Sequence, residues 1–179
     1  LGDNLFYGAQ LEEQLEKFTN VEGAVGFAAH VSDPERYGVY EFDDKMNVIS
    51  IEEKPNYPKS KYAVSGLFFC DNEVVKIANE VKPSVRGELE ITSVLEAYLK
   101  MRKLKVQLMK KGTWFDMGTF DSMLKASQFV QKVEKKRGIK IGCIEEVAYR
   151  KGYIDIRQLH KLAEQSSKSG YGDYLMRIK

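Results

Sequence analysis

The sequence predicts an α/β fold with an added β-hairpin and a helical C-terminal end. Apolar, strand-like runs alternate with segments of helical spacing through residues 1–138, as in proteins that cover a sheet with helices. The turn-forming residues 43–47 separate two short segments, 39–42 and 48–51, which is typical of a hairpin. Beyond residue 138 the spacing is helical. We therefore expect two parts, residues 1–138 and residues 139–179.

Two strands are expected to flank the most informative stretch of the chain. Val48–Ile51 alternates apolar and polar residues, and Pro55 ends this strand because proline has no amide donor. Ala63–Cys70 is almost unbroken apolar sequence, which predicts a strand covered on both faces. Gly66 interrupts it, and a glycine there indicates close approach by a ligand or another backbone. Glu52–Lys54 with Gly66 is a candidate site, although surface charge and a packing glycine would give the same pattern.

The remaining elements follow from spacing and from helix-start residues. Asp33 and Pro34 predict a short helical turn with Asp33 as its cap. Ser93 and Glu96 fit a capping box, although this helix also fits a start near Glu88. Further strands are expected at 23–31 and 106–109, and further helices at 11–18, 72–81, 120–136, 145–150 and 154–163.

The composition excludes several classes of protein. The 28 basic and 26 acidic residues give a net charge of +2, so general nucleic-acid affinity is not expected. No apolar run approaches the roughly 20 residues of a membrane span. The two cysteines, Cys70 and Cys143, indicate a reduced, cytoplasmic protein without a disulfide framework. His30 and His160 lack metal-ligand spacing and are interpreted as structural.

Charged residues at predicted strand and helix ends are candidates for phosphate or metal chemistry. Asp3 and Asp116 each follow strand-like residues, and two carboxylates brought together there would suit Mg²⁺. Arg86 precedes a helix and could present its guanidinium to a phosphate. Pairing of Arg86 with Glu88 or Glu90 is an equally good explanation.

Two further residues are open to a structural interpretation. Lys54 fits either a binding role or a surface charge, and Trp114 by itself is better explained as a core aromatic. No nucleophile–base pair is evident among these candidates. The set therefore favours chemistry that depends on positioning and on charge neutralisation.

Seven motifs in a fixed order resemble the bacterial glucose-1-phosphate thymidylyltransferases, a family of sugar-nucleotide pyrophosphorylases. Each motif is modest alone, but seven in order are specific, and the resemblance runs from Leu1 to about Ile178. The motifs are Leu1–Asn4, Asp33–Val39, Glu52–Pro55, Tyr62–Leu67, Arg86–Thr92, Trp114–Thr119 and Glu145–Arg150.

One expected part of this family is not found in the 179 residues. The family opens with a glycine-rich loop that wraps the nucleotide phosphates, followed by a lysine and a base-reading region. We therefore expect the chain to be the sugar-binding and C-terminal portion of the enzyme, inactive when isolated. The preference for dTTP over UTP is implied by the resemblance alone.

The resemblance implies a Rossmann-like nucleotidyltransferase sheet, a reaction and a set of roles. The reaction joins dTTP and glucose-1-phosphate to give dTDP-glucose and pyrophosphate with Mg²⁺, in dTDP-sugar biosynthesis such as that of rhamnose for cell-surface polysaccharide. The catalytic set would be Asp3 and Asp116, which hold Mg²⁺, and Lys54 and Arg86, which bind the sugar phosphate. The sugar-binding set would be Tyr37, Gly38, Glu53, Val64, Gly66 and Trp114.

The resemblance also implies assembly and regulation. Members commonly form tetramers and bind the pathway end product, here dTDP-rhamnose, at a second nucleotide site between subunits. Lys111 and Arg150 would offer cations to a diphosphate, and Val147 could pack against a base or ribose. Lys111 departs from relatives that often carry arginine there, and ordinary surface charge explains the pattern as well. The full set is Tyr7, Gly8, Lys111, Glu146, Val147 and Arg150.

Two other functions use the same residues. The chain could be a non-catalytic module that binds sugar phosphates or nucleotides, or a regulatory module, because the nucleotide loop is not among its residues. A metal-dependent phosphohydrolase with Mg²⁺ on Asp3 and Asp116 is the third alternative. Turnover with sugar-1-phosphate and dTTP separates them by the product, which is dTDP-sugar, nothing, or free phosphate.

Overall fold

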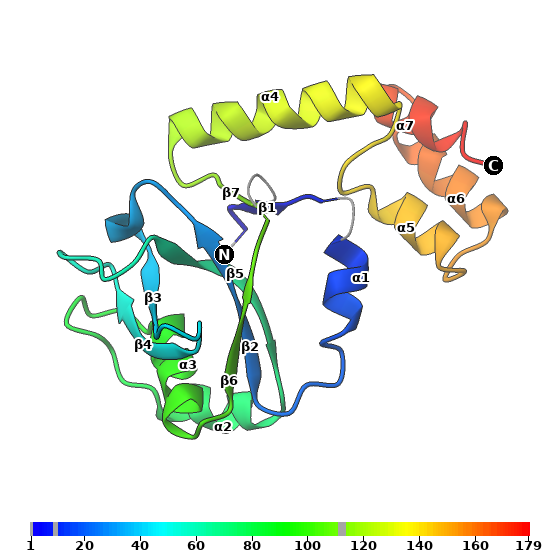
Figure 1. The fold of residues 1–179 in the computed structure, drawn as a ribbon. Coiled ribbons are helices and arrows are strands. Elements are labelled where there is room, and N and C mark those ends of the chain that lie inside the picture. The colour runs from blue at the N-terminus through cyan, green and yellow to red at the C-terminus, as the bar shows by residue number, and fades with distance from the viewer. Residues whose placement is uncertain (1, 9–10, 111–113) are drawn as a thin grey trace. The chain divides into compact units, whose positions relative to one another are not determined.

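The protein has a mixed α/β fold, seen here in a computed structural model that describes residues 2–8, 11–110 and 114–179 (Figure 1). The α/β class, the hairpin and the helical C-terminal end are confirmed. The chain divides into two compact units, Leu1–Met123 and Leu124–Lys179. The predicted boundary at residue 138 coincides with the end of helix α4 (Phe120–Arg137), whereas the two units divide inside that helix.

A five-stranded sheet with the strand order β4–β3–β5–β2–β6 lies at the centre of the first unit (Figure 1). β2 pairs with β6 in parallel, and the other neighbouring strands pair antiparallel. The hairpin β3–β4 therefore forms one edge of the sheet, with Gly38 opposite Glu53. The strands are β2 (Ala24–His30), β3 (Gly38–Phe42), β4 (Val48–Glu53), β5 (Tyr62–Cys70) and β6 (Leu104–Leu108).

Helix α3 (Ile91–Lys100) supplies the main packing against this sheet. Its buried residues Val94, Leu95 and Tyr98 follow helical spacing, so they share one face. Leu95 packs with Ala28, Tyr40, Ile51 and Val64 from the four strands β2 to β5. Val94 and Tyr98 form a second cluster with Ala24, against which residues of α2 (Glu73–Glu80) pack. This packing fixes the start of α3, where the chain enters the candidate site.

Two local expectations are wrong, and one is met in part. Helix α3 begins at Ile91 with Glu90 at its N-cap, nearer to the alternative start at Glu88, so Ser93 lies inside the helix and forms no capping box. Asp33 is the N-cap residue of the short 3₁₀ helix η1 (Pro34–Arg36) and Pro34 is its first residue, as expected, but the Asp33 carboxylate makes no capping bond and instead accepts a hydrogen bond from Arg36. β5 is not covered on both faces along its whole length, since Gly66 is exposed.

A separate two-stranded ribbon joins the beginning of the described chain to residues near 115 (Figure 1). β1 (Asn4–Phe6) and β7 (Trp114–Asp116) pair antiparallel, with Asn4 opposite Asp116. The Met117 amide donates to the Asp3 carbonyl at 2.7 Å and extends the pairing. Asp3 therefore lies immediately before β1 and beside Met117, the residue that follows β7. Helix α1 (Leu11–Glu16) follows β1 after four residues, of which 9 and 10 lie outside the described ranges.

The second unit is helical and has its own core. After most of α4 it contains α5 (Ile144–Arg150), α6 (Ile156–Gln165) and α7 (Gly170–Leu175). Asp155 and Gln158 form a capping box at the start of α6. The core consists of Cys143, Leu159, Ala163, Leu175 and Ile178. Among the helices of the described ranges, none combines the length and the apolar character needed to cross a bilayer.

Candidate functional site

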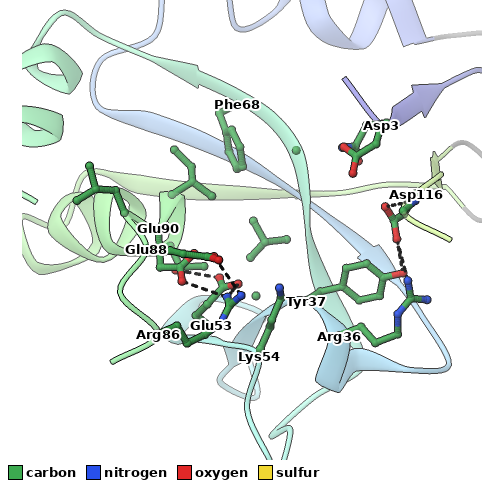
Figure 2. A pocket seen from close by; sticks show the side chains of 18 of the residues that line it. Asp3, Arg36, Tyr37, Glu53, Lys54, Phe68, Arg86, Glu88, Glu90 and Asp116 are labelled. Carbon is green, nitrogen blue, oxygen red and sulfur yellow. Dashed lines mark hydrogen bonds and ion pairs between the residues drawn. The ribbon is translucent and has the colours of Figure 1, made fainter. Parts of the chain in front are cut away.

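A cavity of about 760 Å³ opens in the first unit and is lined by segments from six parts of the chain (Figure 2). Residues from the ribbon β1–β7 lie on one side, and the ends of β3 and β4 with the loop before α3 lie on another. The cavity brings together all ten residues of the expected catalytic and sugar-binding sets, whose roles stay predictions. They are Asp3, Tyr37, Gly38, Glu53, Lys54, Val64, Gly66, Arg86, Trp114 and Asp116.

The Asn4 side chain connects the ribbon to the sheet. Its Oδ1 accepts from the Trp114 indole at 2.6 Å, and its Nδ2 donates to Asp3 Oδ1 at 3.0 Å. A Cβ on Gly66 would lie only 3.1 Å from Asn4 Nδ2, so the glycine leaves room for this side chain. Close approach at Gly66 was expected, and the approaching group is a side chain. Asn4 thereby fixes both Asp3 and Trp114.

Asp116 is held in place by two donors at one oxygen. Its Oδ2 accepts from the Tyr37 hydroxyl at 3.0 Å and from Arg36 Nη2 at 3.2 Å, and its Oδ1 accepts from the Gly118 amide at 3.2 Å. Burial and the Asp116 carboxylate raise the pKa of Tyr37 well above its ordinary value. Tyr37 therefore stays protonated and donates to Asp116. Trp114 packs edge-on against the Tyr37 ring, with centroids 5.4 Å apart.

Asp3 and Asp116 are the residues that could hold a metal ion here. The antiparallel ribbon places the start of β1 beside the end of β7, and Figure 2 shows both carboxylates on the same side of the cavity. No group of three or more His, Cys, Asp or Glu suited to a metal occurs in the described ranges. Two carboxylates are nevertheless compatible with Mg²⁺, which usually takes one or two from the protein and completes its shell with water and phosphate oxygens.

Glu53 and Lys54 lie where β4 ends. Lys54 has a left-handed backbone, with φ of 43°, and its amide donates to the Tyr37 carbonyl at 3.0 Å. Such a conformation is unfavourable for a residue other than glycine, by about 1 kcal/mol, and clusters at functional sites. Figure 2 shows the Lys54 side chain directed into the cavity. The turn thus presents a lysine where a continuing strand would not.

The Glu53 side chain is held by a hydrogen bond from helix α3. Its Oε2 accepts from the Thr92 hydroxyl at 3.0 Å. Gly38 permits this approach, since a Cβ there would meet Thr92 Cγ2 at 2.5 Å and Glu53 Oε2 at 3.2 Å. Burial raises the pKa of Glu53, and the nearby Glu90 carboxylate adds to the effect. Glu53 is therefore an oriented acceptor with a reduced preference for its ionised form.

Arg86 both lines the cavity and forms ion pairs, so the two interpretations of this residue describe the same side chain. Its Nη1 lies 3.1 Å from Glu90 Oε1 and 3.6 Å from Glu53 Oε1, and its Nη2 lies 3.0 Å from Glu88 Oε2. Three carboxylates surround one guanidinium. Lys54 and Arg86 thus bring two cations to the side of the cavity that carries Glu53 (Figure 2).

Three residues that position the side chains of the cavity were given no role from the sequence. They are Arg36, Asn4 and Thr92, which position Asp116, Trp114 and Glu53. All three lie inside the motifs quoted above, which was the signal available for them. Their contacts depend on segments distant in sequence, so the motif alone does not reveal which partner each one holds.

The expected regulatory residues are spread over both units, and their role stays a prediction. Tyr7 and Gly8 follow β1, and Lys111 lies outside the described residues. In α5, Arg150 pairs with Glu146 at 2.7 Å, and Glu146 also accepts from the Tyr174 hydroxyl. Val147 is exposed.

Comparison with known proteins identifies the family of the chain. The nucleotidyl transferase family model matches residues 1–133. A glucose-1-phosphate thymidylyltransferase of Mycolicibacterium smegmatis is 50% identical over 99% of this chain, and one of Neisseria meningitidis is 44% identical over the same share. The chain spans about 62% of the length of each of these relatives.

A solved structure is also similar to this chain. It is a Bacillus anthracis protein described as a glucose-1-phosphate thymidylyltransferase in complex with sucrose, 40% identical, with a TM-score of 0.64. The match covers 79% of this chain and 55% of that one. Nucleotidyl transferases generally use a divalent metal ion, in agreement with the two carboxylates of the ribbon. Since the family model covers about three-quarters of the sequence, the chain belongs to the nucleotidyl transferase family.

Proposed function

We propose that the chain supplies the sugar-1-phosphate site of a glucose-1-phosphate thymidylyltransferase. The observation that carries this proposal is that two cations, Lys54 and Arg86, and two carboxylates, Asp3 and Asp116, line one cavity. Relatives that are 50% and 44% identical carry this name. The substrates would be glucose-1-phosphate and dTTP, and the products dTDP-glucose and pyrophosphate.

The residues divide the work between binding and reaction. Lys54 and Arg86 would bind the phosphate of glucose-1-phosphate, and Glu53, oriented by Thr92, would accept hydrogen bonds from sugar hydroxyls. Tyr37, Gly38, Val64, Gly66 and Trp114 would shape the hexose pocket. A phosphate oxygen of the sugar then attacks the α-phosphorus of dTTP, a new P–O bond forms, and the bond to the β-phosphate oxygen breaks to release pyrophosphate.

Asp3 and Asp116 would hold Mg²⁺, which supplies neutralisation of the phosphate charges when bound. The chain's own part is to keep both carboxylates oriented, through Asn4 at Asp3 and through Tyr37 and Arg36 at Asp116. Positioning and charge neutralisation are what nucleotidyl transfer requires. No nucleophile from the protein is needed.

We further propose that the triphosphate is bound by a glycine-rich loop outside these 179 residues. The complete enzyme would be cytoplasmic and tetrameric, and would be inhibited by dTDP-rhamnose at the second site that includes Arg150. Turnover would then require the chain in its complete form.

An assay with purified proteins tests this function. The 179-residue chain and a completed enzyme, in which the chain is joined to the N-terminal segment of the Mycolicibacterium smegmatis relative, are each supplied with glucose-1-phosphate, dTTP and Mg²⁺. We expect dTDP-glucose from the completed enzyme and no product from the chain alone. Release of inorganic phosphate from glucose-1-phosphate would support a phosphohydrolase instead. Binding without turnover in the completed enzyme would support a non-catalytic module.

A further inference from the structure

The loop that carries Arg86 is closed by its own contacts. The Ser84 amide donates to the Glu88 carbonyl, and the Gly87 amide donates to the Ser84 carbonyl, each at 2.8 Å. The Ser84 hydroxyl accepts from the Arg86 amide at 3.1 Å. These bonds set the direction in which the Arg86 side chain leaves the loop, so its guanidinium meets the carboxylates beside it (Figure 2).

The two glutamates of this loop differ in how firmly they are held. The Glu90 side chain is 10% exposed, and its Oε1 accepts from the Ser84 hydroxyl at 3.0 Å as well as from Arg86. Glu90 is the N-cap residue of α3, and Thr92, the second residue of this helix, is buried. The Glu88 side chain is 61% exposed and meets Arg86 Nη2 from the solvent side. Glu90 is therefore fixed, whereas Glu88 can turn into water.

The carboxylates around Arg86 oppose the binding of a phosphate to its guanidinium. Glu53, Glu88 and Glu90 present three carboxylates to one guanidinium. A guanidinium binds a phosphate best with two parallel N–H groups. A phosphate that approaches Arg86 must therefore replace a carboxylate, and the exposed one is displaced at least cost because exposed ion pairs contribute little.

We infer that Glu90 and Glu88 have opposite effects on sugar-phosphate binding. Glu90 is a positioning residue, which with Ser84 keeps Arg86 directed at the cavity. Glu88 is a competitor within the chain, which occupies the Nη2 edge of Arg86 until a phosphate takes its place. This inference rests on the proposed function, because it assumes that Arg86 binds the phosphate of glucose-1-phosphate.

Matched substitutions separate the two roles. Glu88→Gln and Glu90→Gln each remove one charge and keep the side-chain shape. We expect Glu88→Gln to tighten glucose-1-phosphate binding about two- to fivefold, the range of an exposed ion pair. We expect Glu90→Gln to weaken it about tenfold, because the amide oxygen still accepts from Arg86 but the hydrogen bond loses the charge of the carboxylate. Glu96→Gln removes an exposed carboxylate of α3 that does not line the cavity, and it is the control.

The measurement is the dissociation constant of glucose-1-phosphate for the 179-residue chain, together with its KM in the completed enzyme. The KM for dTTP should stay unchanged in both variants. In an Arg86→Ala background both substitutions should change affinity by less than about 1.5-fold, since they act through the guanidinium. Thermal melting of each variant distinguishes a change in glucose-1-phosphate affinity from loss of the fold.

Separate results would contradict the roles of the two glutamates and the sugar-phosphate site itself. If both variants shift the affinity in the same direction, or if their effects persist without Arg86, the inference is wrong. If Lys54→Ala and Arg86→Ala leave glucose-1-phosphate binding unchanged, the proposed sugar-phosphate site itself fails, whatever the glutamates do.

Discussion

Replacement of Gly66 by alanine should lower turnover indirectly, by displacing the neighbouring side chain of Asn4. Gly66 has no left-handed backbone that alanine would avoid, so the perturbation is confined to the added Cβ. That Cβ would lie 3.1 Å from Asn4 Nδ2 and 3.3 Å from Asn4 Cγ, whereas ordinary contact begins at 3.4 Å. Asn4 must therefore move by a few tenths of an ångström.

The structure gives the size of the effect. Asn4 cannot move without lengthening its bonds to Trp114 at 2.6 Å and to Asp3 at 3.0 Å. Loss of one such half-buried bond would lower the free energy of unfolding by about 1 kcal/mol. Because Asp3 is a proposed metal ligand, we expect kcat to fall about tenfold, less than the roughly hundredfold loss that a 1 Å misplacement can cause.

The assay is kcat and KM in the completed enzyme, with urea unfolding of the same protein. Gly170→Ala is the control, because nothing lies within 4 Å of the Cβ that it adds and its backbone is not left-handed. A Gly66→Ala enzyme with parental kcat would show that the contact of Asn4 does not align Asp3, and the reasoning would be refuted.

Three further substitutions test other parts of the molecule. Asp116→Asn should lower kcat about a hundredfold or more with little change in glucose-1-phosphate affinity, because its charge acts mainly in the transition state. Lys54→Ala should weaken that affinity by about tenfold or more, because its charge also acts in the ground state. The reverse pattern in steady-state kinetics would mean that their roles are exchanged. Arg150→Ala in the completed enzyme should relieve inhibition by a dTDP-sugar and leave glucose-1-phosphate affinity unchanged, so equal inhibition of parent and variant would remove the second site. The Tyr98 hydroxyl and the Gly23 amide hold the pKa of Asp71 below its ordinary 3.8, so this carboxylate stabilises the fold above that pH and ceases to do so as the pH falls through its lower folded value. The melting temperature of the parent should therefore drop more steeply below pH 3.8 than that of Asp71→Asn, and parallel curves would contradict this role.

The residues that form the site could be predicted, because they lie in motifs that the sequence shows directly. The hairpin was equally accessible, since the turn at 43–47 and the alternation around it are local features. By contrast, the three carboxylates around Arg86 depend on the conformation of an irregular loop. The sequence predicted either a phosphate contact or an ion pair for Arg86, and the structure shows ion pairs with Glu88 and Glu90.

The ribbon shows where sequence reasoning reaches its limit. Strands of three residues are too short for a periodicity signal, so the pairing of β1 with β7 was not predicted. This pairing also decides that Asp3 lies at the start of a strand. Helix α7 was missed for a similar reason, because it has six residues and begins with Gly170. Its stability comes from the packing of Leu175 in the second core rather than from helical propensity.

The ribbon also dictates when the cavity can become complete during biosynthesis. Asn4 and Trp114 are separated by 110 positions, so the nascent chain must extend past residue 116 before the two carboxylates can meet. Two strands of three residues do not hold together alone in water, and closing so long a loop costs entropy. The sheet spanning 24–108 should therefore form earlier and the ribbon last. The ribbon should therefore also exchange its amide hydrogens faster than the sheet.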